Sequence, residues 1–374
     1  MTTDSDNPTL NNQHPASGIQ DPGSRIQIIG IIGQGKMGTS IFYSLLSLPY
    51  SLRWIGSPDA DIEKLQQSLD KKILRSLKNG VMSQDEYNNL RQRTIISSDL
   101  NHVSDCDIVI EAIPEELSIK KQLFAALNRI TKSSCILASN SSSINPSQLF
   151  SGTDGDDRII GMHYFFPVQM KEIVELVFTD VTSSEVRENA IYFLLYTNKQ
   201  ILQLDESNSF ILNRLFLDFK NETYKIAEQG KVSEEQLDLL IKEHVFSLGV
   251  FDFMDGVGID TMLTSVKNYI SHYPHQDYYS GLVNKLQSLV DAGNLGLKSG
   301  QGFYRYQDGQ KIYPDRDPGS IKQLSSERER EIIEFLRFTY LNTAKRFTMQ
   351  SGCTIDEMNR AIREYFGLAK GPFE

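Results

Sequence analysis

Cysteine is scarce in this chain, and long apolar runs are absent. Cys106, Cys135 and Cys353 are the only three in 374 residues, and their odd number and wide spacing predict neither a disulfide framework nor a zinc site. No run of about 18 apolar residues occurs, so we expect no membrane-spanning helix. Residues 1–24 are polar and lack the apolar centre of a signal peptide, which predicts a disordered tail. These features favour a reducing cytoplasm.

Positive charge is also in short supply. The chain has 38 Lys and Arg against 48 Asp and Glu, a net charge of −10. This balance argues against nucleic acid as a main partner, because no basic surface is available to neutralise phosphates. A phosphate-bearing ligand must therefore be bound by backbone N–H groups and a few lysines. With 40% hydrophobic and 23% charged residues, the composition is that of a soluble globular protein of two or three domains.

The first half of the chain alternates between expected strands and helices. Helical spacing occupies 59–79 and 117–130, between short apolar runs. Such alternation predicts a parallel sheet that is covered on both faces. The expected strands lie within 26–32, 52–56, 94–97, 107–112, 135–139, 158–165 and 200–207.

The second half is dominated by helical periodicity, beginning with a long amphipathic helix at 210–230. A weak repeat occurs here: Gly230, Gly249 and Phe251 have the same spacings as Gly352, Gly371 and Phe373. Each copy also has a capping-box sequence, Ser233 with Gln236 and Thr354 with Glu357. We therefore expect an α/β domain at 25–207, an all-α domain at 208–310 and a second, repeated helical unit at 311–374.

A glycine-rich turn connects the first expected strand to its helix. Gly33, Gly35 and Gly38 form G-x-G-x-x-G, and Lys36 and Met37 complete the loop. The first glycine permits a tight turn, the second lets the backbone approach a pyrophosphate, and the third lets the helix pack closely on the strand. In this position the motif predicts a Rossmann-type doubly wound domain that binds a dinucleotide.

The acidic residue that usually ends the second strand of such a domain is missing. It would hold the hydroxyl groups of the adenosine ribose, but Gly56 stands at that position, and Asp59 and Asp61 lie in the next turn or helix. Gly56 removes a charge that would repel a 2′-phosphate, yet no Lys or Arg follows to bind one. The choice between NAD and NADP therefore stays open.

Several motifs of residues 26–306 follow one another in a characteristic order. They are "GQGKMG", "DIVIEAIPEELSIKKQLFAAL", "ASNSSS", "GMHYFFPVQMKEIVELV", "SFILNR" and "GLKSGQGFY". In this order and spacing they resemble the 3-hydroxyacyl-CoA dehydrogenase family, which includes the short bacterial 3-hydroxybutyryl-CoA enzymes. The repeated unit at the end of the chain is similar to the duplicated helical domain of some longer relatives.

The resemblance implies four catalytic positions. His163 matches the family's catalytic histidine and Glu175 the glutamate that pairs with it. Ser142 matches a serine that contacts both substrate and nicotinamide, and Asn213 an asparagine that completes the substrate site. Because histidine commonly titrates near neutral pH, it suits the removal of a hydroxyl proton while hydride leaves the neighbouring carbon. A carboxylate on its other nitrogen fixes the tautomer and stabilises the imidazolium.

The resemblance also implies cofactor contacts. Glu115, Lys120 and Lys298 match such positions, in addition to Ser142, whereas Glu111 is a family hallmark that we take as structural. One further residue departs from the family: Phe166 stands where an asparagine contacts the cofactor near the nicotinamide.

We therefore expect an NAD-dependent dehydrogenase acting on a 3-hydroxyacyl-CoA in fatty acid metabolism. One alternative is a hydroxyacyl group on an acyl carrier protein, as in polyketide extender-unit pathways, for which the lysine-rich segment 71–78 offers a contact surface. Another is a non-catalytic, crystallin-like binding protein. For assembly we expect a monomer, or a dimer that does not use the family's usual helical interface.

Overall fold

The computed structural model describes residues 26–150, 154–230, 232–271, 273, 275–312 and 324–374. The predicted tail at 1–24 lies outside the described residues, as does the segment 313–323 of the predicted second helical unit. The chain forms two compact units, Met1–Ser209 and Phe210–Glu374. Among the described residues, no helix is both long enough and apolar enough to cross a membrane.

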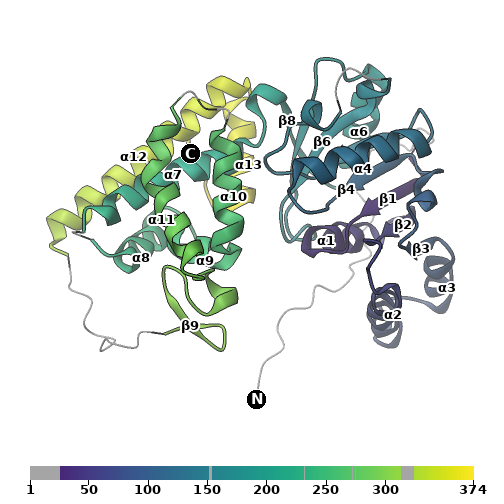
Figure 1. The fold of residues 1–374 in the computed structure, drawn as a ribbon, viewed down its shortest axis with the longest axis horizontal. Coiled ribbons are helices and arrows are strands. Elements are labelled where there is room, and N and C mark those ends of the chain that lie inside the picture. Colours follow the sequence, from purple (N-terminus) through teal and green to yellow (C-terminus); the bar gives the residue numbers. More distant parts are fainter. Residues whose placement is uncertain (1–25, 151–153, 231, 272, 274, 313–323) are drawn as a thin grey trace. The chain divides into compact units, whose positions relative to one another are not determined.

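The first unit is built on an eight-stranded sheet with the order β3-β2-β1-β4-β5-β6-β7-β8 (Figure 1). Its strands are β1 Ile28–Ile32, β2 Ser51–Ile55, β3 Thr94–Ser97, β4 Ile108–Glu111, β5 Ile136–Ser139, β6 Ile159–Tyr164, β7 Ile173–Phe178 and β8 Gln200–Asp205. Its helices are α1 Lys36–Leu45, α2 Ile62–Lys78, α3 Gln84–Gln92, α4 Leu117–Ile130, α5 Pro146–Leu149 and α6 Ser184–Tyr196.

The predicted doubly wound sheet is confirmed by its two apolar cores. Ile29 and Ile31 of β1 share one core with Phe42 of α1, while Ile32 shares the other with Phe124 of α4. Successive side chains of a strand point to opposite faces, so a strand that is buried on both faces is apolar at nearly every position. After β3, at the edge of the sheet, the chain returns to form β4 beside β1. The strand order reverses between β1 and β4, and this is the switch point where a dinucleotide binds in such folds.

The direction of β7 departs from the predicted parallel sheet. β7 runs antiparallel to β6, and β8 runs parallel to β7. The connection 165–172 is too short for the crossover that a parallel pair requires, which takes about a dozen residues or more. This reversal has a consequence for the site, because its register places His163 directly opposite Glu175.

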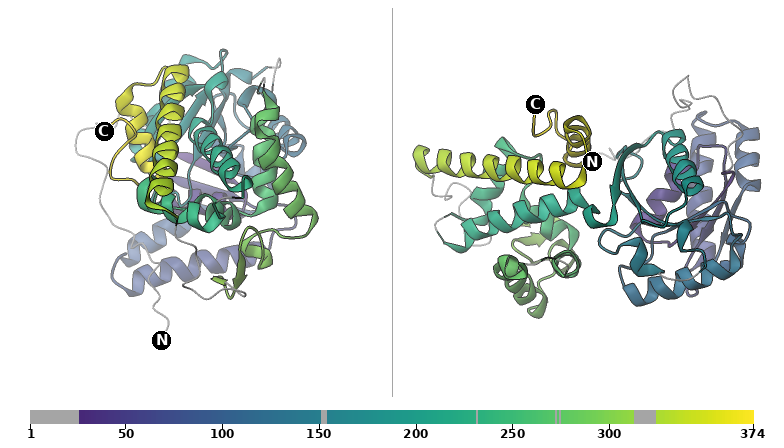
Figure 2. Two further views of the ribbon diagram at one scale, coloured as in Figure 1. Left: turned by 90° about the vertical axis from the view of Figure 1, so that its left-hand side faces the viewer. Right: turned by 90° about the horizontal axis from the view of Figure 1, so that it is seen from above.

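The second unit is mainly helical. Its helices are α7 Ile211–Glu228, α8 Glu234–His244, α9 Val250–Val257, α10 Ile259–Ile270, α11 Ser280–Asp291, α12 Ser326–Ser351 and α13 Ile355–Phe366. It also contains a short hairpin of β9 Arg305–Gln307 and β10 Gln310–Ile312, which the helical periodicity did not predict. Figure 2 shows α12 running alongside α7, and the two helices are in contact.

The sequence repeat has a structural counterpart in this unit. Both predicted capping boxes are present, at the starts of α8 and α13. In the first copy Asp238 Oδ1 accepts a hydrogen bond from Phe251 N at 3.0 Å, and in the second Asn359 Oδ1 accepts one from Phe373 N at 3.0 Å. The same side-chain-to-backbone bond thus closes each copy.

Candidate active site

The glycine loop between β1 and α1 can accept a pyrophosphate. Gly33 has φ of +120°, and a Cβ there would lie 2.4 Å from the carbonyl oxygen of Ala112. A Cβ on Gly38 would lie 2.1 Å from the Gly33 oxygen, whereas a Cβ on Gly35 would meet nothing within 4 Å. Gly35 caps α1 without a side-chain hydrogen bond, and the first turn has no acidic residue. The N–H groups of this turn are therefore available to an anion.

Substitution by alanine should have different effects at Gly38 and at Gly35. Gly38→Ala forces a methyl group into the Gly33 backbone and lowers the free energy of unfolding by about 1–3 kcal/mol. Gly35→Ala leaves folding unchanged, because its methyl group enters open space, but weakens NADH binding about tenfold by holding the pyrophosphate off the backbone. Thermal unfolding and NADH titration of both variants separate the two effects. Equal NADH affinity in Gly35→Ala and the wild type would contradict this assignment.

After β2, neighbouring side chains leave no room for the usual acid at position 56. A Cβ on Gly56 would lie 2.7 Å from the Cβ of Ala60. Beside it, the Gln34 side chain donates to Ser57 Oγ at 2.6 Å and accepts from Ser57 N at 3.0 Å. A hydrogen bond with Ser57 lowers the pKa of the exposed Asp59 carboxyl. Ser57 and Asp59 are therefore the polar groups that this turn offers in place of the missing acid.

The other departure from the family pattern forms a contact with the glycine loop. The Lys36 ammonium lies 4.1 Å from the ring centroid of Phe166, a cation–π contact. The ring remains 44% exposed. Phe166 thus links the loop to the segment that follows β6.

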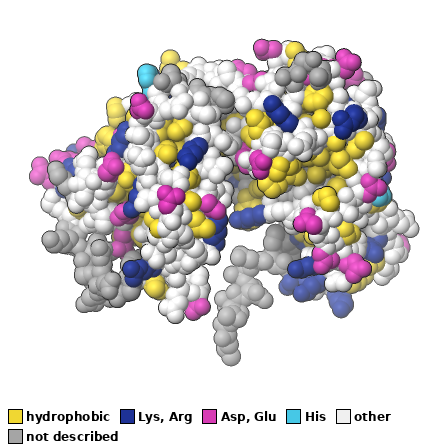
Figure 3. Space-filling view, in the orientation of Figure 1, with side chains coloured by type: hydrophobic (Ala, Val, Ile, Leu, Met, Phe, Trp, Pro, Cys, Tyr) yellow, Lys and Arg dark blue, Asp and Glu magenta, His cyan; other side chains and the backbone are white. Residues whose placement is uncertain are grey.

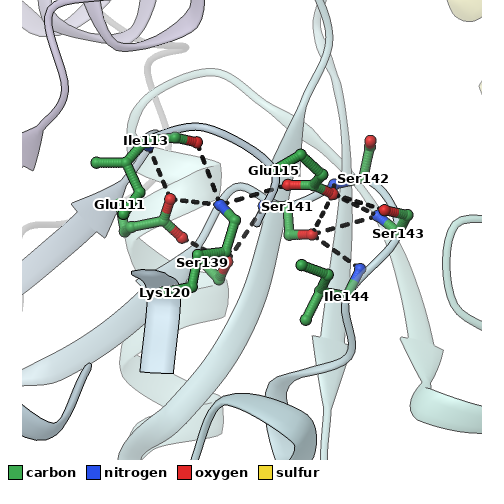
Figure 4. Close-up of polar contacts among 9 residues, drawn as sticks. All are labelled: Glu111, Ile113, Glu115, Lys120, Ser139, Ser141, Ser142, Ser143 and Ile144. Carbon is green, nitrogen blue, oxygen red and sulfur yellow. Dashed lines mark hydrogen bonds and ion pairs between the residues drawn. The ribbon is translucent and has the colours of Figure 1, made fainter. Parts of the chain in front are cut away.

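Glu115 organises the serine loop that follows β5 (Figure 4). Its Oε1 accepts hydrogen bonds from the hydroxyls of Ser141 and Ser143, at 2.5 and 2.7 Å, and from the backbone N–H groups of Ser142 and Ser143, both at 3.0 Å. Burial alone would raise the pKa of Glu115, but Lys120 and these hydrogen bonds lower it below its ordinary value. In Figure 4 the Ser142 hydroxyl points away from this carboxylate, so it can serve a ligand.

Lys120 lies at the centre of the same network and is 1% exposed. Its Nζ contacts Glu111 Oε1 at 2.5 Å, Glu115 Oε2 at 3.3 Å and the Ile113 oxygen at 3.3 Å. An ammonium group has three protons, and these acceptors account for all of them. Glu111 is fully buried and also accepts from Ser139 Oγ at 2.7 Å. Lys120 therefore holds Glu115 in place, and Glu111 holds Lys120.

His163 and Glu175 form a buried pair between β6 and β7. His163 is 5% exposed and Glu175 is fully buried, with 2.7 Å between Nδ1 and Oε2. Asn140, at the start of the serine loop, accepts from Tyr164 N through its side chain at 2.8 Å. Because Nδ1 faces the carboxylate, Nε2 is the nitrogen that can take a proton from a substrate.

The two remaining candidates, Asn213 and Lys298, belong to the helical unit. Asn213 donates from Nδ2 to Tyr269 Oη at 2.9 Å and accepts at Oδ1 from Tyr365 Oη at 2.8 Å. Lys298 Nζ contacts both oxygens of Asp260, at 2.5 and 2.6 Å. Sequence reasoning did not single out either tyrosine, and no local pattern marks them. Ser141 and Ser143 were also missed, although the run "ASNSSS" contains both.

Two models of one protein family match the chain. They describe the NAD binding domain of 3-hydroxyacyl-CoA dehydrogenase, over residues 28–207, and the C-terminal domain of the same enzymes, over residues 210–306. A glyoxysomal fatty acid beta-oxidation multifunctional protein of Brassica napus is 29% identical over 95% of this chain and 51% of its own length. The chain thus spans about half the length of this relative. A probable 3-hydroxyacyl-CoA dehydrogenase of Caenorhabditis elegans is 30% identical over 76% of the chain and 94% of its length.

Solved structures show the same similarity. An (S)-3-hydroxybutyryl-CoA dehydrogenase from Ralstonia eutropha has a TM-score of 0.67 and 27% identity, covering 75% of this chain and 99% of that one. A 3-hydroxybutyryl-CoA dehydrogenase from Escherichia coli K12 has a TM-score of 0.77 over 93% of this chain and 90% of its own, and its 19% identity shows the fold alone. With two domain models matched in sequence order and a C. elegans relative at 30% identity, the chain belongs to the 3-hydroxyacyl-CoA dehydrogenase family.

Proposed function

We propose that the protein interconverts 3-hydroxyacyl and 3-oxoacyl thioesters of coenzyme A, with NAD as the hydride carrier. The observation that carries the proposal is the buried pair of His163 and Glu175, 2.7 Å apart. Support comes from the matched NAD binding domain and from a glycine loop whose backbone can meet a pyrophosphate. A histidine held this way by a carboxylate has the arrangement of a general base.

In this proposal the pair of His163 and Glu175 transfers the proton, and NAD carries the hydride. When bound, NAD supplies the nicotinamide that accepts hydride from the carbon bearing the hydroxyl. His163 Nε2 removes the hydroxyl proton as the hydride leaves, because Nδ1 is committed to Glu175. Glu175 keeps the imidazole in one tautomer and stabilises its positive charge. In the reverse direction the imidazolium returns the proton to the 3-oxo oxygen.

Ser142 and Asn213 are proposed to bind the substrate oxygens. The Ser142 hydroxyl can donate to the reacting oxygen, because Glu115 uses the Ser142 backbone N–H and not its hydroxyl. Asn213 retains one N–H for the thioester carbonyl, since an amide nitrogen has two protons and Tyr269 accepts one. Lys298 is proposed as a cofactor contact, on its match to the family motif.

The direct test is oxidation of NADH and of NADPH in the presence of acetoacetyl-CoA. We expect turnover with NADH. Turnover with NADPH alone would mean that Gly56 selects the phosphorylated cofactor. No turnover with either cofactor, from protein that circular dichroism shows to be folded, would contradict the proposal. It would favour a substrate bound to an acyl carrier protein first, and the crystallin-like alternative only if that substrate also gave no turnover.

A second candidate substrate is a hydroxyacyl group on an acyl carrier protein, and a surface feature favours it. Lys71, Arg75 and Lys78 of α2 are exposed, and Figure 3 shows Lys and Arg side chains gathered over this region. Lys72 lies instead 3.9 Å from the ring centroid of Tyr43, and burial lowers its pKa. Reversing the charge of Lys71 and Lys78 should raise KM for a carrier-bound substrate while leaving KM for acetoacetyl-CoA unchanged. Equal effects on both substrates would exclude this surface as a carrier contact.

We also infer that the enzyme works in the cytoplasm as a monomer, or as a dimer without the family's usual helical interface. The internal repeat supports the inference about assembly. A second helical unit that packs on the first within one chain can cover the surface through which two chains would otherwise associate. Light scattering that shows a tight dimer through the family's interface would contradict it.

A further inference from the structure

The last helix of the chain reaches the proposed substrate asparagine. Tyr365 of α13 donates from Oη to Asn213 Oδ1 at 2.8 Å, and Asn213 donates from Nδ2 to Tyr269 Oη at 2.9 Å. One tyrosine hydroxyl thus contacts the nitrogen of the Asn213 side-chain amide, and the other contacts its oxygen. The matched C-terminal domain covers residues 210–306. It includes Asn213 and Tyr269, whereas Tyr365 comes from the helical unit that follows it.

The packing of α13 fixes the position of Tyr365. The neighbouring Phe366 is 3% exposed and stacks on Phe246, with 4.1 Å between ring centroids, and it meets Phe216 edge-on at 5.0 Å. Ser247 Oγ donates to the Phe366 oxygen at 2.6 Å. The Tyr365 ring also meets Phe216 edge-on at 6.5 Å, and Phe216 lies on α7 one turn after Asn213.

The two hydroxyls constrain how the amide can be used. An asparagine side chain offers two N–H donors and two oxygen lone pairs. With Tyr269 accepting from Nδ2 and Tyr365 donating to Oδ1, one N–H and one lone pair remain. Rotation of the amide about χ2 would break both bonds, so the remaining N–H keeps one direction. A hydrogen-bond donor held in place before substrate arrives loses less freedom on binding.

We propose that Tyr365 is a positioning residue, supplied by the C-terminal helical unit, that orients the Asn213 amide toward the acyl thioester. The inference rests on the proposed function, because it takes Asn213 to contact the substrate. Through Tyr365, the helical unit after residue 310 would contribute to substrate binding.

The test compares Tyr365→Phe with the wild type in NADH-linked reduction of acetoacetyl-CoA. Loss of one neutral hydrogen bond should lower kcat/KM for the thioester by about three- to tenfold. KM for NADH should stay unchanged. The matched control is Tyr340→Phe in α12: the Tyr340 hydroxyl is buried and, within the described residues, has no hydrogen-bond partner, so the variant should behave as the wild type.

A double-mutant cycle separates positioning from general stabilisation. In an Asn213→Ala background, Tyr365→Phe should have no further effect on kcat/KM, because its hydroxyl acts through the missing amide. An additional loss of the same size in that background would overturn the inference, as would wild-type kinetics in the single variant. A wild type that is inactive on acetoacetyl-CoA would instead overturn the proposed function, and the inference with it.

Discussion

Replacing His163 by glutamine should lower kcat by about 10²–10⁴-fold, the usual contribution of a positioned general base. Glutamine keeps a polar group beside Glu175, but it can neither take a proton from the 3-hydroxyacyl substrate nor return one to the 3-oxoacyl substrate. The fold of the protein and its affinity for NADH should change little. NADH binding is assigned to the glycine loop and to the loop that Glu115 organises, and His163 lies on β6. Rapid-mixing measurements of NADH oxidation with acetoacetyl-CoA, together with NADH titration, give the two quantities.

The matched control is another histidine of the same domain. His102 is exposed, and its ring nitrogen contacts only the Asp99 oxygen, at 3.3 Å, among the hydrogen bonds found in the described residues. His102→Gln should leave kcat unchanged. A reduction of kcat by less than tenfold in His163→Gln would show that another group transfers the proton.

Replacing Lys120 by methionine should destabilise the first unit by about 3–5 kcal/mol, the usual result of removing one partner of a buried ion pair. The substitution leaves the Glu111 carboxylate, which is fully buried, without the ammonium that lies 2.5 Å away. Trp54 provides the probe, because it is the only tryptophan and is 1% exposed in the first unit. Its fluorescence during urea unfolding reports this unit alone.

A second lysine of the same unit serves as the control. Lys132 pairs with Asp107, but its side chain is 41% exposed. Lys132→Met should therefore change the free energy of unfolding by less than about 1 kcal/mol. Adding Glu111→Gln to Lys120→Met removes the unpaired charge and should recover part of the loss. A double variant no more stable than Lys120→Met would show that the pair's electrostatics do not cause the effect.

Much of the fold follows from local sequence patterns. The apolar strands, the helices between them, the glycine turn before α1 and the capping boxes at Ser233 and Thr354 all depend on residues close together in the chain. The pairing of His163 with Glu175 also depends on residues that are close together in the chain. The two residues are twelve positions apart, and a short connection makes β6 and β7 adjacent antiparallel strands.

Other features depend on contacts between distant segments, which no local pattern encodes. Glu115 contacts the serine loop 26 to 28 residues away, and Tyr365 contacts Asn213 across 152 residues. Which donor meets which acceptor is decided by how helices pack on strands and on one another. The sequence by itself therefore determined the two kinds of domain and the glycine loop, and the catalytic positions are proposed from its match to the family's motifs. Only the tertiary structure decided that Lys120 is enclosed by carboxylates and that the last helix supplies a hydroxyl to Asn213, because packing brings together residues whose spacing in the chain carries no signal.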